Sequence, residues 1–383
     1  MSQKPVPRRG VDGAERRGES AGRRGSVRRA LLIGLLLVPA PALGLDRDER
    51  VIFFPTLGYP VGAGAWELGI HGWVFEPEKR RTPVAAFQAT LGLSTCELTP
   101  AGRDLVAERA RAFLVDNERG KRVVIRLGAR EFRLAPSGAS GHFAGRLRLG
   151  EDDLAPLRGA ADPDRVPFRA VLAPGDARVF DGVVQLAGET GWSIVSDVDD
   201  TIKISQVRDR EALLQHTFCR PFEPVPGMTD VYRAWASAPR ARFHYVSASP
   251  WPLYPALSAF AGSSGFPDGT WHLKPFRWKD QSVFDLFAKP DAYKTSVIEP
   301  LLVRFPRRRF VLVGDSGERD PEIYGSLARR YPGRIARVLI RDVTAEPATA
   351  GRYREAFRGL PPDVGQVFGV PSEIAGALEH IRP

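Results

Sequence analysis

The chain has 383 residues, of which 43% are apolar and 26% charged, and its formal net charge is +10. This composition excludes a chain that is disordered throughout, and the length suffices for two domains. The charge does not indicate a nucleic-acid partner, because residues 1–29 hold nine basic against three acidic residues and no basic stripe with interleaved aromatic residues follows.

The first 45 residues are typical of an export signal. A basic stretch that ends in Arg28-Arg29 precedes the apolar run 30–38, and prolines and small residues follow it as far as Gly44. The run is short for a membrane-spanning helix, so residues 28–45 favour a signal peptide, with an uncleaved anchor as the alternative. We therefore expect an exported protein, either periplasmic or associated with a membrane.

Residues 46–190 are expected to form a mostly-β, sandwich-like domain. Short apolar runs alternate there with turn residues, which is typical of such domains. The segments 121–127 and 131–134 flank Gly128-Ala129-Arg130, a hairpin signal. A helix at roughly Gly102–Phe113 interrupts the pattern.

The two cysteines, Cys96 and Cys219, carry little information. They are 123 residues apart, and their surroundings show no spacing typical of a zinc site. We do not expect them to be paired, although a disulfide stays open as an alternative.

The pattern changes to strand, loop and helix from residue 191 to the end of the chain at 383. This alternation predicts an α/β domain with a doubly wound parallel sheet. The expected strands are 192–197, 243–248, 310–315 and 335–341, and the expected helices are 228–237, 252–261, 292–304 and 320–331.

Acidic residues follow two apolar runs of this region. Asp197 and Asp199 come after the first run, and Asp315 and Asp320 come after the second. Because the carboxyl ends of parallel strands border the crevice where α/β proteins bind ligands, we expect these carboxylates to lie together. Such a cluster repels itself unless a cation lies within it, and oxygen ligands suit Mg²⁺. The sequence thus predicts a metal-dependent phosphoryl-transfer site in which Asp315 and Asp320 hold the metal.

The first acidic segment also supplies candidates for the chemistry itself. Asp197 is placed to attack phosphorus, and Asp199 is placed to act as general acid and base. Thr201 would donate a hydrogen bond nearby. The alternative is a turn rich in aspartate that caps the next element.

Other candidates would contact the phosphate. Ser247 ends an expected strand and would bind a phosphate oxygen together with the backbone amides of Ala248 and Ser249. The alternative is a helix cap at Ser249, with Pro250 at the first helical position. Lys294, near the start of an expected helix, would neutralise the phosphate, and Lys274 competes for that role.

The order of these motifs resembles that of the haloacid dehalogenase-like phosphohydrolases, and the match is closer to one branch. Five blocks within residues 191–345 are similar to the catalytic domain of the actin-patch-type phosphatidate phosphatases. The blocks are Ser196–Lys203, Pro224–Met228, Tyr245–Trp251, Gly265–Pro267 and Leu312–Glu322.

This resemblance implies a Mg²⁺-dependent enzyme that hydrolyses phosphatidate to diacylglycerol and phosphate. It implies that Asp197 is the nucleophile, that Asp199 is the general acid–base, and that Lys294 is the stabilising lysine. It further implies that Ser247 binds phosphate and that the metal is held by Asp197, Asp315, Asp320 and the backbone carbonyl of Asp199.

Two other functions remain open at this point. One is a phosphatase for a soluble phosphomonoester, and the other is an exported protein that binds through its β-domain. A phospholipid at a membrane surface is the expected partner, since Trp251, Tyr254 and Trp271 would suit a membrane interface. The spacing of Trp251, Tyr254 and Leu257 is more often that of a helix that packs in a core. No oligomeric state is predicted.

Overall fold

The computed structural model describes residues 45–79, 82–93, 100–276 and 291–379, which belong to one compact unit. The export signal expected at residues 1–45 therefore lies almost entirely outside the described residues. None of the helices in these four ranges combines the length and the apolar character that crossing a bilayer requires.

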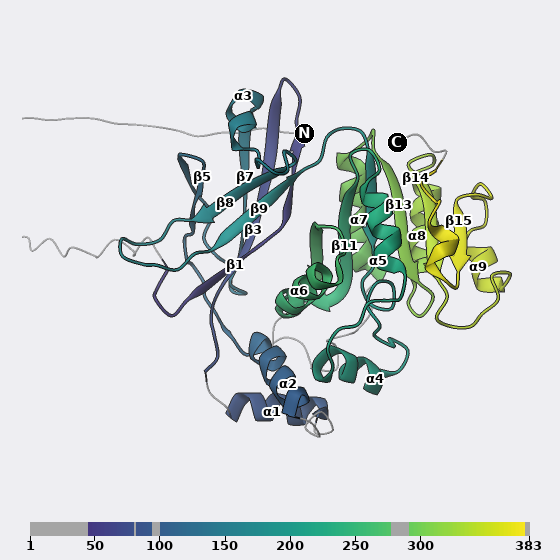
Figure 1. Ribbon diagram of the computed structural model, residues 1–383, viewed down its shortest axis with the longest axis horizontal. Coiled ribbons are helices and arrows are strands. Elements are labelled where there is room, and N and C mark those ends of the chain that lie inside the picture. Colours follow the sequence, from purple (N-terminus) through teal and green to yellow (C-terminus); the bar gives the residue numbers. More distant parts are fainter. Residues whose placement is uncertain (1–44, 80–81, 94–99, 277–290, 380–383) are drawn as a thin grey trace, which may run out of the picture. The chain divides into compact units, whose positions relative to one another are not determined.

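Nine strands of the N-terminal region form one mixed sheet (Figure 1). The long strand β3 pairs with β1, β2, β4 and β7, and the sheet continues from β2 through β9, β8, β5 and β6. Only the pairing of β2 with β9 is parallel among these neighbours. The strands are β1 Arg50–Phe54, β2 Thr56–Pro60, β3 Ala65–Glu76, β4 Asp116–Asn117, β5 Val124–Leu127, β6 Arg130–Arg133, β7 His142–Gly150, β8 Arg165–Ala170 and β9 Asp181–Leu186.

The alternation of side chains along these strands explains the core of this sheet. Leu68 and Ile70 of β3 meet Ile125 of β5 and Phe168 of β8 in one buried cluster. Distant parts of the sheet thus share a core, in line with the expected mostly-β domain. The hairpin β5–β6 is confirmed, and its turn uses Gly128, whose positive φ of 59° suits glycine.

Two helices of the N-terminal region lie between β3 and β4 in the sequence: α1 (Thr82–Leu91) and α2 (Pro100–Phe113). The helix expected at Gly102–Phe113 is confirmed as α2, whereas α1 was not predicted. Helix α2 packs against a π-helical turn at Gln215–Cys219 in the C-terminal region. Cys219 is disulfide-bonded, against the expectation, and Cys96 lies outside the described residues.

The C-terminal region contains a six-stranded parallel sheet in the order β12-β11-β10-β13-β14-β15. All four predicted strands are present, and the strands β12 and β15 at the two edges were missed. The strands are β10 Trp192–Ser196, β11 Arg242–Pro250, β12 Gly269–Lys274, β13 Arg309–Asp315, β14 Ile335–Arg341 and β15 Gly365–Phe368.

Helices cover both faces of this parallel sheet (Figure 1). Successive strand residues alternate between two clusters: Ile194 packs in a cluster with α5 and α6, and Val195 in a second cluster with α7 and α8. The doubly wound α/β fold is therefore confirmed. The helices of the described chain that follow α2 are α3 Glu151–Leu154, α4 Arg210–Leu214, α5 Met228–Ala236, α6 Tyr254–Ser264, α7 Asp291–Arg304, α8 Asp320–Arg330 and α9 Gly351–Ala356.

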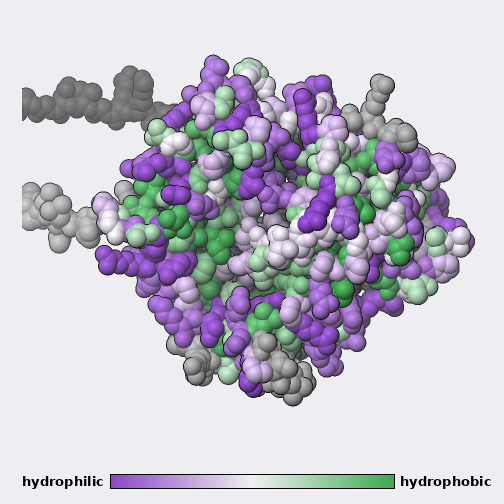
Figure 2. All heavy atoms as spheres, viewed as in Figure 1, coloured by the Kyte–Doolittle hydropathy of each residue, from purple (hydrophilic) through white to green (hydrophobic). Residues whose placement is uncertain are grey.

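The aromatic residues considered for a membrane interface are core residues instead. Trp251, Tyr254 and Trp271 are 6–8% exposed and pack in the cluster beneath α6. Hydrophilic residues cover much of the face shown in Figure 2. Over the described residues the exposed large apolar side chains are four separated valines, at positions 61, 179, 303 and 370. The core alternative, and not the membrane interface, thus holds for these aromatic side chains.

Candidate active site

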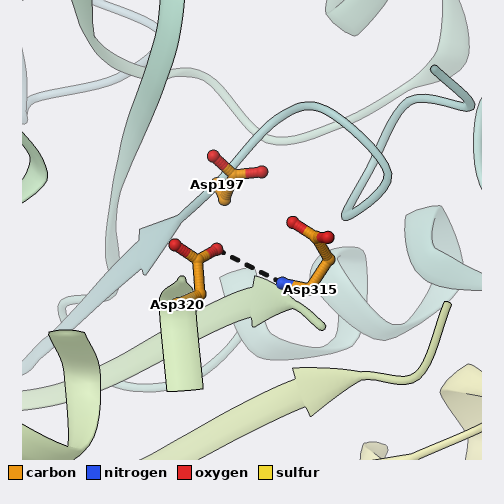
Figure 3. Close-up of side chains that lie close together, drawn as sticks. All are labelled: Asp197, Asp315 and Asp320. Carbon is orange, nitrogen blue, oxygen red and sulfur yellow. Dashed lines mark hydrogen bonds between the residues drawn. The ribbon is translucent and has the colours of Figure 1, made fainter. Parts of the chain in front are cut away.

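Carboxylates from separate elements converge at the carboxyl edge of the parallel sheet. Asp197 follows β10, Asp315 ends β13, and Asp320 begins α8. Figure 3 shows their side chains gathered around one point, where one carboxylate oxygen from each lies within 4.8 Å of the others. All three are at most 1% exposed. The parallel sheet brings them together because β10 and β13 are hydrogen-bonded neighbours.

Lys294 contacts two members of this acidic triad. Its Nζ lies 2.8 Å from Asp197 Oδ1, 2.5 Å from Asp320 Oδ1 and 3.1 Å from Glu318 Oε2. Burial alone lowers the pKa of Lys294, but the neighbouring carboxylates raise that pKa well above its ordinary value. Lys294 therefore stays protonated and tethers the start of α7 to the triad.

One lysine does not balance the negative charge of the triad. Burial raises the pKa of Asp197 and of Asp315 well above the ordinary value, and the negative charge of Asp320 raises both further. Two buried oxygens, Asp197 Oδ2 and Asp315 Oδ2, have no hydrogen-bond partner within the described part of the chain. Unpaired, buried carboxylate oxygens that face one another fit the ligand set of a metal ion.

Asp199 lies beside the triad and is held by four contacts. Its Oδ1 accepts from Ser205 Oγ at 2.7 Å and lies 2.9 Å from Lys203 Nζ. Its Oδ2 accepts from Ser247 Oγ and Ser249 Oγ, each at 3.0 Å. Burial alone would raise the pKa of Asp199, but Lys203 and the hydroxyl donors outweigh it and lower the pKa to about 2. Asp199 is thus ionised with a fixed orientation.

The turn that follows is organised by Asp200, which has a positive φ of 55°. Its carboxylate accepts from the backbone amides of Ser205, Gln206 and Val207 at 2.7–2.9 Å, and Arg341 donates to its carbonyl oxygen at 2.7 Å. Asp200 therefore has the structural role in a turn that was the alternative for this acidic segment, whereas Asp197 and Asp199 face the site.

The expected phosphate contacts occupy the end of β11. Ser247 accepts from the Ser249 amide at 2.9 Å, and the register with β12 shifts between Ser247 and Pro250, which takes Ala248 and Ser249 out of the regular ladder. The proposed helix cap at Ser249 is wrong: the strand runs through Pro250, and the Ser249 hydroxyl donates to Asp199 instead. Thr201 is fully buried, and its hydroxyl has no partner among the residues described.

The structure separates the two candidate lysines. Lys294 contacts the triad, whereas Lys274 ends β12 next to Pro250 in the register of the sheet. Asp320 does not cap α8, because Arg319 precedes the helix and Asp320 is its first residue. Instead Asp320 Oδ2 accepts from the Asp315 amide at 3.2 Å, which couples the two acidic residues (Figure 3).

Sequence reasoning missed three residues that surround the site: Lys203, Ser205 and Glu318. Lys203 is 1% exposed and forms an ion pair with the residue four positions before it. The available signal was a lysine that lies among apolar residues and close to two aspartates. When such a lysine is buried, it almost always has a charged partner. Nothing in the spacing of Ser205 or Glu318 distinguishes them from ordinary loop residues.

Gly314 allows Asp320 to approach the strand, which gives a first prediction. A Cβ at position 314 would lie 2.2 Å from Asp320 Oδ2, so Gly314→Ala must displace this carboxylate. We expect a loss of about 1–3 kcal/mol in the free energy of unfolding, measured by denaturant titration, because the packing is tight. Gly262→Ala, at an exposed position of helix α6 where a Cβ meets nothing within 4 Å, is the matched control and should be neutral or stabilising. Equal stability of the two variants would contradict this view of Gly314.

The doubly wound parallel sheet carries a buried acidic triad, a lysine and strand-end serines at its carboxyl edge, as expected from the resemblance of the sequence motifs to the haloacid dehalogenase-like phosphohydrolases. Residues 192–342 match the family model of the phosphatidate phosphatase APP1 catalytic domain, a domain of the phosphomonoester hydrolases. The resemblance expected from the sequence motifs is thereby confirmed for this segment.

Two curated proteins of fungi are similar to the chain over the same part. An uncharacterized protein of Schizosaccharomyces pombe is 32% identical over 167 residues, which is 43% of this chain and 27% of the relative. Phosphatidate phosphatase APP1 of Saccharomyces cerevisiae is 29% identical over 189 residues, 49% of this chain and 29% of that protein. The chain thus spans less than a third of the length of either relative.

Solved structures give weaker matches. A protein assigned as a haloacid dehalogenase-like hydrolase of Burkholderia xenovorans has a TM-score of 0.29 and 12% identity, over 46% of this chain and 91% of that chain. One assigned as a β-phosphoglucomutase of Thermotoga maritima has a TM-score of 0.31 and 13% identity, over 49% and 99%. At these values neither match adds to what the topology of the sheet shows.

Proposed function

We propose that the protein is a Mg²⁺-dependent phosphatidate phosphatase that releases diacylglycerol and phosphate through an aspartyl phosphate on Asp197. The observation that carries the proposal is the buried triad of Asp197, Asp315 and Asp320, with Lys294 bound to two of its members. A binding protein has no need of a buried nucleophile beside a second, ionised aspartate. The match of residues 192–342 to a phosphatidate phosphatase domain supports the choice of substrate.

Asp197 begins the proposed reaction as the nucleophile. Its Oδ1 is held by Lys294, and its Oδ2 has no hydrogen-bond partner among the described residues. In this proposal one oxygen of the carboxylate attacks phosphorus while the other is available to the metal. The P–O bond to diacylglycerol breaks as the bond from Asp197 to phosphorus forms. Lys294 offsets the charge that gathers on the phosphoryl group.

Asp199 carries the protons. Its ionised form, favoured by Lys203, suits the removal of a proton from the water that hydrolyses the aspartyl phosphate. For the first step, the proton of a phosphate monoanion passes through Asp199 to the leaving oxygen of diacylglycerol. In this proposal the hydroxyls of Ser247 and Ser249, which donate to Asp199, and the backbone amide of Ala248 contact the phosphate oxygens.

The ligands of Mg²⁺ in this proposal are Asp197, Asp315 and Asp320, with the backbone carbonyl of Asp199. The three carboxylates supply oxygen donors at this point, which suits a hard cation. When bound, the ion offsets the repulsion between the carboxylates and the phosphate and orients the phosphoryl group.

Metal binding gives a prediction that does not depend on turnover. Because the folded-state pKa of each triad carboxyl is raised, the metal-free fold loses stability as the pH rises from the ordinary value of 3.8 toward neutrality. At pH 7, Mg²⁺ at about one hundred times its Kd should add about 2.7 kcal/mol to the free energy of unfolding. This stabilisation is detected as a rise in Tm. Asp315→Asn should remove this rise. A Tm that is insensitive to Mg²⁺ and EDTA in the wild type would contradict the metal site.

The substrate is tested by phosphate release from phosphatidate in detergent micelles, beside p-nitrophenyl phosphate as a soluble phosphomonoester. We expect Mg²⁺-dependent release from phosphatidate that EDTA abolishes. Release from the soluble ester alone would keep the chemistry and overturn the lipid substrate.

We also propose that the protein acts outside the cytoplasm, at a membrane surface, because residues 1–45 have the features of an export signal.

A further inference from the structure

The ring of Phe222 contacts two buried cations. Arg109 from α2 stacks on the ring with its Cζ 3.9 Å from the centroid, and Lys203 Nζ lies 4.9 Å from the same centroid. Arg109 is 6% exposed and Lys203 is 1% exposed. Cation–π contacts are strongest where both groups are removed from water, so this arrangement fixes the lysine.

Backbone pairing explains how Phe222 reaches Lys203. The Ile204 amide donates to the Glu223 carbonyl at 2.9 Å, and the Val225 amide donates to the Ile202 carbonyl at 2.9 Å. The chain that leaves the acidic turn thus returns antiparallel to it. Phe222 is thereby brought beside Lys203, and its ring also contacts Arg109 of α2.

Arg109 attaches this returning segment to α2. Its Nη1 donates to the carbonyl oxygens of Thr217 and Arg220 at 2.6 and 2.8 Å, and α2 packs against the turn Gln215–Cys219. Burial lowers the pKa of Arg109 only to about 10, so the guanidinium is charged at neutral pH. A buried guanidinium with two backbone acceptors and a ring beneath it has little freedom to move.

Lys203, which Phe222 contacts, in turn contacts Asp199. Its Nζ lies 2.9 Å from Asp199 Oδ1 and donates to Ser205 Oγ, which itself donates to the same carboxylate oxygen. The lysine therefore holds one oxygen of Asp199 while Ser247 and Ser249 hold the other. A shift of about 1 Å at such a group is enough to cost about 10²-fold in rate.

We propose that Lys203 is a positioning residue for Asp199, and that α2 of the N-terminal region keeps Lys203 in place through Arg109 and Phe222. The inference rests on the proposed phosphatase function and adds to it a part for a region outside residues 192–342. The N-terminal region then belongs to the catalytic unit and is more than a substrate-docking module.

A double-mutant cycle on the full chain tests this inference. Lys203→Met should lower kcat for phosphatidate about 10²-fold with little change in KM, because substrate is not bound through Lys203. Arg109→Met should lower kcat about tenfold in the wild-type background and have no further effect in Lys203→Met. Arg111→Met, an exposed position on the same helix, is the control and should leave kcat unchanged.

Conservative variants separate positioning from folding. Phe222→Tyr keeps the aromatic face and should retain most of kcat, whereas Phe222→Leu should match Arg109→Met. The same cycle of Arg109 and Lys203 is measured by urea unfolding, where coupled losses show the stack without any need for turnover. Wild-type kcat in Lys203→Met, or independent effects of the two substitutions on kcat, would overturn the inference. Coupled unfolding in a protein that hydrolyses neither substrate would instead overturn the proposed function and leave the stack in place.

Discussion

Asp197→Asn is expected to reduce phosphate release by at least about 10⁴-fold, the loss typical for the removal of a residue at the centre of a catalytic group. Asparagine has nearly the same shape as aspartate but is not a nucleophile toward phosphorus. Asp199→Asn should reduce kcat by about 10²–10⁴-fold, since a positioned acid–base is lost while the nucleophile remains. Both are measured as kcat with Mg²⁺ in excess.

The fold of Asp197→Asn should persist, which makes the loss of rate interpretable. Lys294 keeps its contacts with Asp320 and Glu318, and one member of a self-repelling triad is neutralised. Thermal unfolding of the variant without metal should therefore resemble that of the wild type. A variant with a wild-type rate, or one that is inactive only because it is unfolded, would remove the support for Asp197 as nucleophile.

Lys294→Met is expected to lose both activity and stability. The substitution leaves Asp197, Asp320 and Glu318 without their shared cation, and uncompensated buried charge of this kind costs about 3–5 kcal/mol. We expect a corresponding loss of unfolding free energy at pH 7 in the absence of metal, together with a kcat lower by orders of magnitude. Denaturant titration and phosphate release measure the two effects.

The stability loss of Lys294→Met should depend on pH in a defined direction. The pKa values of Asp197 and Asp320 are raised in the fold, so these groups take up protons as the pH falls toward the ordinary value of 3.8. Protonation removes the charge that Lys294 balanced, and the gap between variant and wild type should narrow. Lys274→Met is the matched comparison. If Lys274→Met lowered kcat more than Lys294→Met does, Lys274 and not Lys294 would be the catalytic lysine.

The acidic triad was predictable because it depends on a simple rule of α/β sheets. Asp197 and Asp315 follow apolar runs, and strands that are parallel neighbours place their carboxyl ends together whatever the helices between them do. The four inner strands of the sheet were predictable for the same reason. Strands β12 and β15 were not, since an aromatic, polar run such as Gly269–Lys274 and a four-residue strand give little periodic signal.

The choice between the two lysines depended on packing that the sequence does not encode locally. Lys294 reaches the triad because α7 packs against α8 and β11, which sets the rotation of the helix about its axis. The role of Lys203 required a contact between its neighbour Phe222 and Arg109, more than one hundred residues upstream. Long-range contacts of side chains from loops and inserted helices leave no regular spacing in a single sequence.

The most direct test of the proposed mechanism is to trap the covalent intermediate. Wild-type protein is mixed with Mg²⁺ and phosphatidate that carries a radiolabelled phosphate, quenched in acid within the first turnover, and digested for mass spectrometry. The mechanism predicts an acid-stable, base-labile phosphoryl group on the peptide that contains Asp197, and none in Asp197→Asn. Turnover of phosphatidate with no label on that peptide at any quench time, or label carried by another residue, would contradict it.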